Sequence, residues 1–398
     1  MSPDADVIVA GAGPAGSVAA AALAARGLRV ILCDRAAFPR DKVCGDALIA
    51  DSLAVLDRLG LGQRVAARAA TAPALDVMSP SGVTASIPGT LRVLPRRELD
   101  AMLVDHAVGA GAEFLRLTID APIADGDRIA GVSARDASGA VRELRAPLTV
   151  LATGANAAVL GAFDPRARSE ASGTALRVYA RPRNPSAHGP GSPCAIAVDR
   201  SLRPGYAWAF PAPDGLFNVG VGLFRGADLR ARGVNLRASL EALLAGHGPI
   251  GRRFGPFTDA SPIAGAPLRT GLRGTAVTRR GLVVLGEAAG TTYAATGEGI
   301  GKAMESALLL DELAAASADL PALGLAFPGA LRATFGPRFR AYDVAERWVS
   351  YPWFVDYVAR RATESPYITR RLSEFLSETQ PPSRVFSLRG LWRLTTAR

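Results

Sequence analysis

The sequence has little lysine for so basic a chain. Lys42 and Lys302 are its only lysines among 46 basic residues, so the net charge of +10 comes almost entirely from arginine. The arginines are spread along every segment, beside abundant Ala, Gly and Pro, which indicates a compositional bias rather than a surface for a polyanion. No zinc-finger or RNA-binding motif accompanies the charge, and we therefore expect no nucleic-acid partner.

Cysteine, histidine and long apolar runs are also scarce. Three cysteines are too few for a disulfide framework or a four-cysteine zinc site, and the three histidines are scattered, so we expect no metal site. The first residues, MSPDADVIVAG, lack the basic segment of a secretory signal, and no apolar run reaches the roughly 18 residues of a membrane span. These absences predict a cytoplasmic protein.

The first 35 residues follow a strand–turn–helix–strand pattern. The apolar run 6–10 is broken by the sequence GAGPAG, and residues 17–26 are strong helix formers. Gly27 ends this helix, and residues 28–33 form a second apolar strand. The pattern predicts a βαβ unit and therefore a parallel sheet with helices on its faces.

The glycine-rich turn of this unit has the spacing of a dinucleotide-binding fingerprint, G-x-G-x-x-G. Gly11 allows the tight turn, Gly13 lets a pyrophosphate approach the backbone, and Gly16 lets the helix pack closely on the strand. The pyrophosphate would lie at the helix N-terminus, and Asp34, at the end of the second strand, would accept hydrogen bonds from ribose hydroxyls. The fingerprint predicts a dinucleotide cofactor without separating NAD from FAD.

Later motifs resemble those of flavoproteins. Residues 286–290 (GEAAG) follow an apolar strand and resemble the second FAD fingerprint of glutathione-reductase-type flavoproteins, and residues 297–301 (GEGIG) open another helix. Together with PRDKVCGD at 39–46, GYAWAFP at 205–211 and NVGVG at 218–222, they resemble the geranylgeranyl reductase family. That family belongs to a wider group with aromatic hydroxylases and flavin-dependent halogenases, and the resemblance covers roughly residues 5–310.

The segment pattern and the resemblance together predict an α/β fold. It would combine a Rossmann-type, glutathione-reductase-like FAD-binding domain with an inserted antiparallel β-sheet substrate domain and a C-terminal helical region. The predicted FAD-binding domain is discontinuous and comprises residues 1–73, 97–165 and 270–328. The β-rich domain would comprise 74–96 and 166–269, and the helical region 329–398.

The resemblance implies an FAD site assembled from separate segments. Glu287 stands where the family usually has aspartate, and Arg97 matches an arginine that reaches FAD, although a solvated helix-surface arginine fits the charge pattern equally well. Thr153 replaces the aspartate of the Asp-Gly pair in hydroxylases, which favours the reductase-like members. The implied cofactor residues are Gly11, Gly13, Pro14, Ala15, Gly16, Asp34, Arg35, Arg40, Cys44, Gly45, Arg97, Thr153, Gly154, Gly286, Glu287, Gly290, Gly297, Gly299 and Ile300.

Three aromatic residues are candidates for substrate binding. Tyr206, Trp208 and Phe210 alternate with alanines, so on a strand they face the same side. They would form either an apolar wall for a hydrophobic substrate or an ordinary core. Halogenases carry tryptophan at the position of Tyr206, which argues against halogenation.

The catalytic candidates are Cys44, Tyr206 and Lys42. A thiol with an ordinary pKa of about 8.5, beside Lys42 and Arg40, can donate a proton to a reduced double bond, and the Tyr206 hydroxyl is a second candidate donor. A buried Cys44 that packs as a small apolar residue is the structural alternative.

These observations predict an FAD-dependent oxidoreductase that transfers hydride to or from a carbon–carbon bond of a hydrophobic, isoprenoid- or polyketide-like molecule. Because no second G-x-G-x-x-G follows a strand, NADPH or NADH is expected to dock transiently, and a partner reductase or the substrate itself are alternative electron sources. Two further alternatives remain: an NAD(P)H- and O2-dependent monooxygenase of bacterial secondary metabolism, and a flavin-binding protein without turnover. The segment 384–394 mixes arginine with large apolar residues, and we expect a docked helix there rather than peripheral contact with an anionic membrane.

Overall fold

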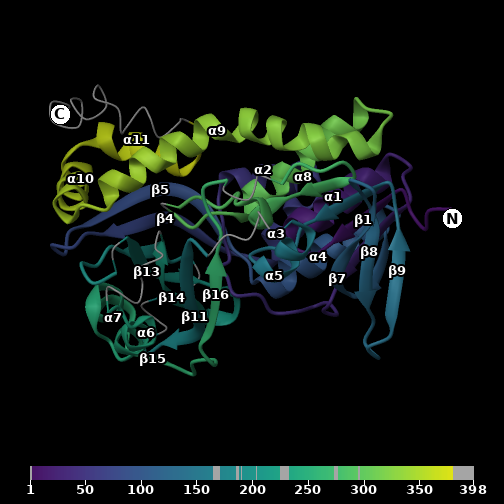
Figure 1. Ribbon diagram of the computed structural model, residues 1–398. Helices are drawn as coiled ribbons and strands as arrows, with labels where there is room; N and C mark the ends of the chain where they lie inside the picture. Colours follow the sequence, from purple (N-terminus) through teal and green to yellow (C-terminus); the bar gives the residue numbers. More distant parts are fainter. Residues whose placement is uncertain are drawn as a thin grey trace.

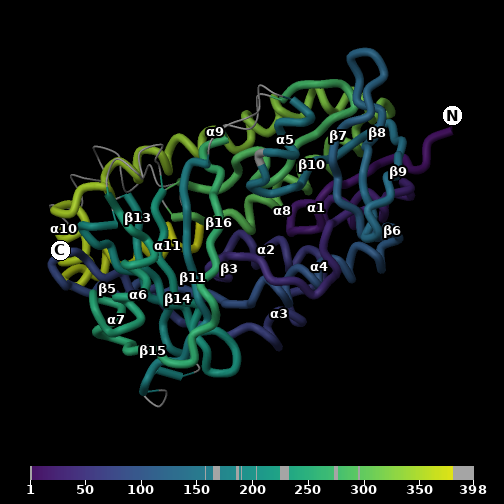
Figure 2. Tube along the Cα trace, turned by 60° about the horizontal axis from the view of Figure 1, so that its bottom comes forward, coloured from purple at the N-terminus to yellow at the C-terminus, as the bar shows by residue number. Residues whose placement is uncertain are grey.

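The computed structural model describes residues 2–164, 171–184, 188–189, 191–202, 204–224, 233–272, 277–294 and 296–379. Two sheets lie side by side, and C-terminal helices run along one edge of both (Figure 1). In a second view the N-terminal end and α10 (Pro352–Glu364) again lie at opposite ends of an elongated molecule (Figure 2). The segment 384–394 lies outside the described residues.

The first sheet is parallel throughout, as the βαβ pattern predicts. From edge to edge its described strands are β17 (Leu282–Val284), β10 (Leu148–Leu151), β1 (Val7–Ala10), β2 (Val30–Asp34) and β6 (Glu113–Arg116). Three helices pack together on it: α1 (Pro14–Ala25), α4 (Arg96–Gly109) and α8 (Ile300–Ala315). The four residues of β1 are fully buried, which is the ordinary state of a central parallel strand covered on both faces.

Close packing explains the glycines of the turn between β1 and α1. Gly11 has a φ of +104°, a conformation that side chains disfavour. A Cβ atom at Gly16 would overlap the carbonyl oxygen of Gly11, so α1 can only approach the turn this closely with glycine there. Gly16 therefore serves the packing of helix on strand.

The second sheet has nine described strands. In order they are β15 (Phe257–Thr258), β11 (Gly173–Pro182), β14 (Phe217–Phe224), β13 (Gly205–Pro211), β12 (Cys194–Ala197), β4 (Ala70–Met78), β5 (Thr84–Val93) and β3 (Ala47–Leu48), with β16 (Ala264–Leu268) also paired to β11. Its pairs are antiparallel except that β12 and β4 run parallel. The sheet expected to be antiparallel thus contains one parallel pair, because alternation of apolar residues identifies strands but not their partners.

Smaller elements complete the two halves. A three-stranded sheet and five short helices contribute: β7 (Thr118–Asp125), β8 (Arg128–Arg135), β9 (Val141–Arg145), α2 (Ala50–Arg58), α3 (Gly62–Arg68), α5 (Ala157–Phe163), α6 (Leu236–Leu244) and α7 (Gly248–Phe254). Among the described residues, short turns of 3-10 helix lie at η2 (Pro213–Gly215), η4 (Gly286–Ala289) and η5 (Leu320–Ala322).

The C-terminal region is helical, as expected. Helix α9 (Leu323–Val349) runs along the top of Figure 1 from the parallel sheet to the second sheet, where α10 and α11 (Pro366–Leu376) pack on β5. Its buried residues Phe327, Leu331, Phe335 and Phe339 recur every fourth position, so one face of the helix enters the core. These helices cover the junction between the two sheets.

Candidate functional site

A cavity of about 770 Å³ lies at the junction of the two sheets and the C-terminal helices. One part of its wall is the glycine-rich turn, the end of β2 and the loop before β3. The wall continues along the aromatic strand β13 and the turn before α8, and then along α9, α10 and α11. A space of this size can hold a large cofactor or ligand, and its lining is mainly apolar.

The end of the cavity at the parallel sheet has the features of an anion and ribose site. Gly13 precedes α1, whose first turn has no side-chain cap. The carboxylate of Asp34 accepts hydrogen bonds from the backbone N–H groups of Ala12, at 2.9 Å, and Ala36, at 3.0 Å, which fix it at the end of β2. Guanidinium groups of Arg40 and Arg96 lie beside Gly13, so positive charge faces the helix N-terminus.

The arginine of α4 that lines the cavity is Arg96 rather than Arg97. Arg97 is exposed and does not line the cavity, whereas Arg96 is buried and lines it. Arg96 donates from Nε and Nη2 to the two oxygens of Asp100, at 2.6 and 2.7 Å, and Arg40 Nη1 lies 2.8 Å from the same carboxylate. Neighbouring positions of a helix point about 100° apart, so position 96 of α4 faces the cavity while position 97 faces solvent.

The loop that carries Cys44 packs directly on the aromatic strand. A Cβ atom at Gly45 would lie 3.3 Å from Phe210 and 3.7 Å from Nε1 of Trp208. Cys44 and Lys42 both line the cavity there. Burial raises the pKa of the Cys44 thiol, with the nearby Arg96 opposing the shift, so the thiol is protonated at neutral pH.

Asp46 is a buried site residue that the sequence did not single out. Its carboxylate accepts hydrogen bonds from the Tyr179 hydroxyl and from Nδ2 of Asn218, the latter at 2.8 Å. Burial raises the pKa of Asp46 to about 6, although both hydrogen bonds favour the charged form. Its position as the last residue of the 39–46 motif was the available signal.

The three predicted aromatic residues all line the cavity. Trp208 and Phe210 are also buried in a core cluster, so they serve both as wall and as core. Trp208 donates from Nε1 to Oδ1 of Asn218 at 2.9 Å, and the Tyr206 hydroxyl donates to the backbone carbonyl of Thr296. Burial raises the pKa of Tyr206 above its ordinary value.

The second FAD motif also reaches the cavity. Glu287 lines it, accepts a hydrogen bond of 3.4 Å from the backbone N–H of Arg269, and has a pKa raised by burial. Gly286 approaches α1 so closely that a Cβ atom there would lie 2.8 Å from that of Ala15. Thr153 lines the cavity, and its buried hydroxyl has no hydrogen-bond partner within the described residues.

Most predicted cofactor residues are brought together by the fold. Those that line the cavity are Gly11, Gly13, Pro14, Ala15, Asp34, Arg35, Arg40, Cys44, Gly45, Thr153, Gly154, Glu287, Gly297, Gly299 and Ile300. Gly16, Arg97, Gly286 and Gly290 are not part of its lining. The three glycines lie behind it, where Gly16 and Gly286 allow close packing and Gly290 ends a helical turn at a φ of +83°.

The turn before α8 adds a carboxyl group to the cavity. Glu298 lines it, and burial together with the negative charges of Glu378 and Asp51 raises the pKa of Glu298 to about 8. The sequence indicated the glycines of this turn but not the acid between them.

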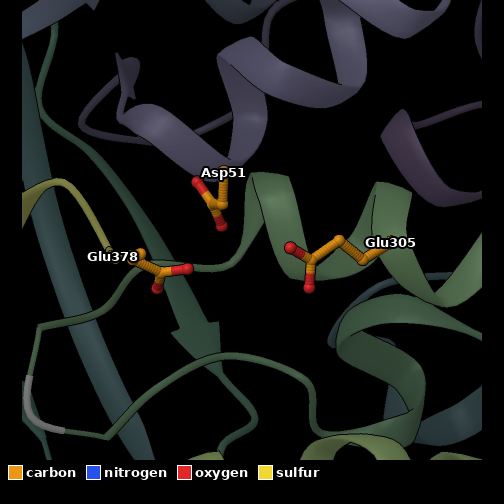
Figure 3. Close-up of side chains that lie close together, drawn as sticks. All are labelled: Asp51, Glu305 and Glu378. Atoms are coloured by element: carbon orange, nitrogen blue, oxygen red, sulfur yellow. The ribbon is translucent and has the colours of Figure 1, made fainter. Parts of the chain in front are cut away.

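Lys302 lies directly behind that turn in a charge network of five residues. Its Nζ lies 2.8 Å from Asp51, 2.6 Å from Glu378 and 3.4 Å from Glu305. Figure 3 shows these three carboxylates converging from α2, from α8 and from the segment after α11. Arg338 of α9 adds a second cation, 3.2 Å from Glu305 and 3.4 Å from Glu378. We call these five residues the Lys302 network.

The chemistry of this wall fits FAD. The uncapped helix N-terminus beside two guanidinium groups suits a pyrophosphate, the Asp34 carboxylate suits ribose hydroxyls, and the unpaired Thr153 hydroxyl offers a further hydrogen bond. The residues that would hold the cofactor come from the first sheet and from the loop before β3.

Comparison with known proteins agrees with this fit. Residues 4–191 match the family model described as an FAD binding domain. The chain is 31% identical over 327 residues to menaquinone reductase of Mycolicibacterium smegmatis, covering 79% of this chain and 77% of that protein. It is 30% identical over 323 residues to digeranylgeranylglycerophospholipid reductase 1 of Methanopyrus kandleri, covering 78% and 80% respectively.

Solved structures share the whole fold. A geranylgeranyl bacteriochlorophyll reductase-like protein from Thermoplasma acidophilum superposes with a TM-score of 0.77 over 98% of both chains, at 19% identity. A flavin-dependent brominase superposes with a TM-score of 0.74 over 98% of both chains, at 18% identity.

Fold, site and sequence similarity together define an FAD-dependent oxidoreductase. Within that class, the chain belongs to the geranylgeranyl reductase family. In the part of the chain that the structure describes, no helix is both long and apolar enough to cross a membrane.

Proposed function

We propose that the protein reduces a carbon–carbon double bond in an isoprenoid-like molecule. The observation that carries this proposal is the apolar continuation of the cavity beyond the FAD motifs. There β4 and β5 supply Leu75, Val77 and Ile87, and the C-terminal helices supply residues such as Val358 and Leu376. A long apolar wall can bury a linear hydrocarbon chain. The two relatives are named for menaquinone and for digeranylgeranyl lipids, and both of these molecules contain such chains.

The proposal assigns a role to each part of the chain. Residues 1–73, 97–165 and 270–328 would bind FAD, and residues 74–96 and 166–269 would hold the substrate against the aromatic strand. The helical region 329–398 would cover the apolar chain. This division is supported by the cavity wall, which the two sheets and α9 to α11 share.

When bound and reduced, FAD supplies a hydride. The chain's own residues orient the double bond, exclude water and supply a proton to the second carbon. Of the two donors expected from sequence, Tyr206 already donates to the Thr296 carbonyl, whereas the Cys44 thiol is protonated and lines the cavity. Lys42 would add positive charge beside them, and NADPH or NADH would deliver the electrons transiently.

The test is an anaerobic sequence of half-reactions. The purified, FAD-loaded protein is titrated with NADPH and with NADH, then mixed with menaquinone or a digeranylgeranyl lipid in detergent micelles. We expect bleaching of the flavin by one nicotinamide, followed by reoxidation and a lipid product heavier by two hydrogens. Failure to bind FAD, or reoxidation without a hydrogenated product, contradicts the proposal.

A monooxygenase is the second candidate, because a hydroxylase shares the fold. Anhydrotetracycline hydroxylase from Streptomyces rimosus superposes with a TM-score of 0.62 over 94% of this chain. The same experiment distinguishes a monooxygenase from a reductase. For a monooxygenase, admission of oxygen to the reduced protein would give an oxygenated product whose formation depends on the substrate.

A further inference from the structure

Glu298 holds a carboxyl group in a tightly fixed turn of the cavity wall. A Cβ atom at Gly297 would lie 2.9 Å from the Phe224 ring and 3.5 Å from the Tyr206 hydroxyl, so the turn presses against the aromatic sheet. The backbone carbonyl of Glu298 accepts a hydrogen bond of 2.9 Å from the N–H of Tyr293. The turn therefore holds Glu298 at a defined position beside the proposed substrate wall. The roles assigned above do not include this carboxyl group.

Charged groups from three elements face Glu298. Asp51 comes from α2, Lys302 from α8 and Glu378 from the segment after α11. Burial and the two carboxylates outweigh Lys302, so Glu298 keeps its proton at neutral pH. The Tyr206 hydroxyl, from β13, lies near the same group, and its own pKa is raised by burial and by Glu298.

On the α9 side, the Tyr342 hydroxyl also lies near this group and donates a hydrogen bond of 3.3 Å to Glu378. Both tyrosines have pKa values above their ordinary range, so neither adds charge around Glu298 at neutral pH. The proton on Glu298 is thus set by the carboxylates and by burial.

The charges of Asp51, Lys302 and Glu378 act on this carboxyl, and the side chains of the Lys302 network range from fully buried to partly exposed. The Lys302 side chain is fully buried, that of Glu378 is 11% exposed, that of Glu305 is 24% exposed and that of Arg338 is 36% exposed. Burial and Asp51 also raise the pKa of Glu378. A set of polar groups whose exposure increases toward the surface allows an acid in the cavity to be reprotonated without opening the cavity to water.

We infer that Glu298 is the acid that protonates the substrate carbon, and that the Lys302 network reprotonates it from solvent. The inference rests on the proposed function. In the reduction the π bond is lost, one carbon gains the hydride that reduced flavin supplies, and its neighbour gains the proton of Glu298. The carboxylate left behind takes a proton from solvent through Glu378, and the nicotinamide donor restores the electrons.

The decisive variant is Glu298→Gln, which keeps the shape of the side chain but cannot release a proton. We expect normal FAD content and normal bleaching by NADPH or NADH, with transfer to menaquinone or the digeranylgeranyl lipid slowed about 100-fold or more. Glu312→Gln, at an exposed position on α8, is the matched control and should behave as wild type. Transfer at the wild-type rate in Glu298→Gln overturns the inference, as does a comparable loss confined to Cys44→Ala.

A second readout needs no substrate. Infrared spectra of the protein, recorded across the pH range, should contain a protonated-carboxyl band that disappears with a midpoint near pH 8. That band should be missing from Glu298→Gln and present in Glu312→Gln, and its persistence in Glu298→Gln contradicts the inference. If wild type reduces neither probe lipid, the proposed function fails, while the infrared titration still reports on Glu298.

Discussion

Trp208 donates a hydrogen bond of 2.9 Å from its indole N–H to Oδ1 of Asn218. The amide nitrogen of Asn218 in turn donates to the Cys44 carbonyl and to the Asp46 carboxylate, at 2.8 Å each. Residues of the three motifs at 39–46, 205–211 and 218–222 are thus joined through one fully buried side chain. Asn218 fixes the loop that carries Cys44 against the aromatic wall of the cavity.

Replacing Asn218 with leucine should therefore destabilise the protein by about 1–3 kcal/mol, because it leaves the buried indole N–H without an acceptor and removes one of the donors to Asp46. The pKa of Asp46 should rise further above its value of about 6 in the same variant. Urea unfolding followed by tryptophan fluorescence measures the first effect. Unchanged stability would mean that the network does not hold the loop.

Substitution of Arg96 should weaken both the fold and FAD binding. Removing its guanidinium leaves the fully buried Asp100 with Arg40 as its ion-pair partner among the described residues, and a broken buried pair costs about 3–5 kcal/mol. We expect Arg96→Ala to be purified with reduced FAD content and a lower melting temperature. The neighbouring Arg97→Ala, at an exposed position, is the control and should stay within about 0.5 kcal/mol of wild type.

The parallel sheet and the dinucleotide turn were predictable from local pattern. Strand, glycine spacing and helix are consecutive in the chain there, and the close contact that requires glycine at Gly16 is with Gly11 of the same turn. The neighbours of Gly11 and Gly13, by contrast, come from distant segments, Ala152 for the first and Arg40 and Arg96 for the second. The position of Arg97 outside the cavity wall depends on a local detail too, because the sequence pattern does not show which face of α4 points inward. A shift of one position rotates a side chain by about 100°, from the cavity to solvent.

The charged part of the site was not predictable in this way. Asp51, Lys302 and Glu378 meet only because α2, α8 and the end of α11 converge, and no spacing in the sequence connects them. Lys302 is one of two lysines in the sequence and follows the 297–301 turn directly, but its three carboxylate partners and the charges around Glu298 depend on tertiary packing. The parallel pairing of β12 with β4 has the same origin.

Lys42 should be sensitive even to a change that keeps its charge. It lines the cavity, and its positive charge favours the ionised forms of both Cys44 and Glu287. A guanidinium is planar and larger than an ammonium, so Lys42→Arg should slow flavin reduction or lipid turnover several-fold. Stopped-flow bleaching by NADPH measures the first rate. Wild-type kinetics in this variant would remove Lys42 from the catalytic candidates.

The stability of the protein should fall as the pH rises toward 8. The pKa of Glu298 is raised from an ordinary 4.5 to about 8, so between these values the folded protein binds a proton that the unfolded chain has released. Stability from this group is complete below pH 4.5 and is lost as the pH passes through 8, with a slope of up to about 1.4 kcal/mol per pH unit. Asp46 acts in the same direction, but its contribution is lost by about pH 6.

Comparing wild type with Glu298→Gln isolates the contribution of the Glu298 carboxyl to the pH dependence of stability. Glutamine does not titrate, so the variant should lose the slope between about pH 6 and pH 8 and gain stability relative to wild type at the upper end. Urea unfolding at fixed ionic strength, repeated at pH 5, 6, 7, 8 and about 9, measures both curves. Parallel curves would show that Glu298 titrates as it does in an unfolded chain, and would remove the protonated acid on which its catalytic role depends.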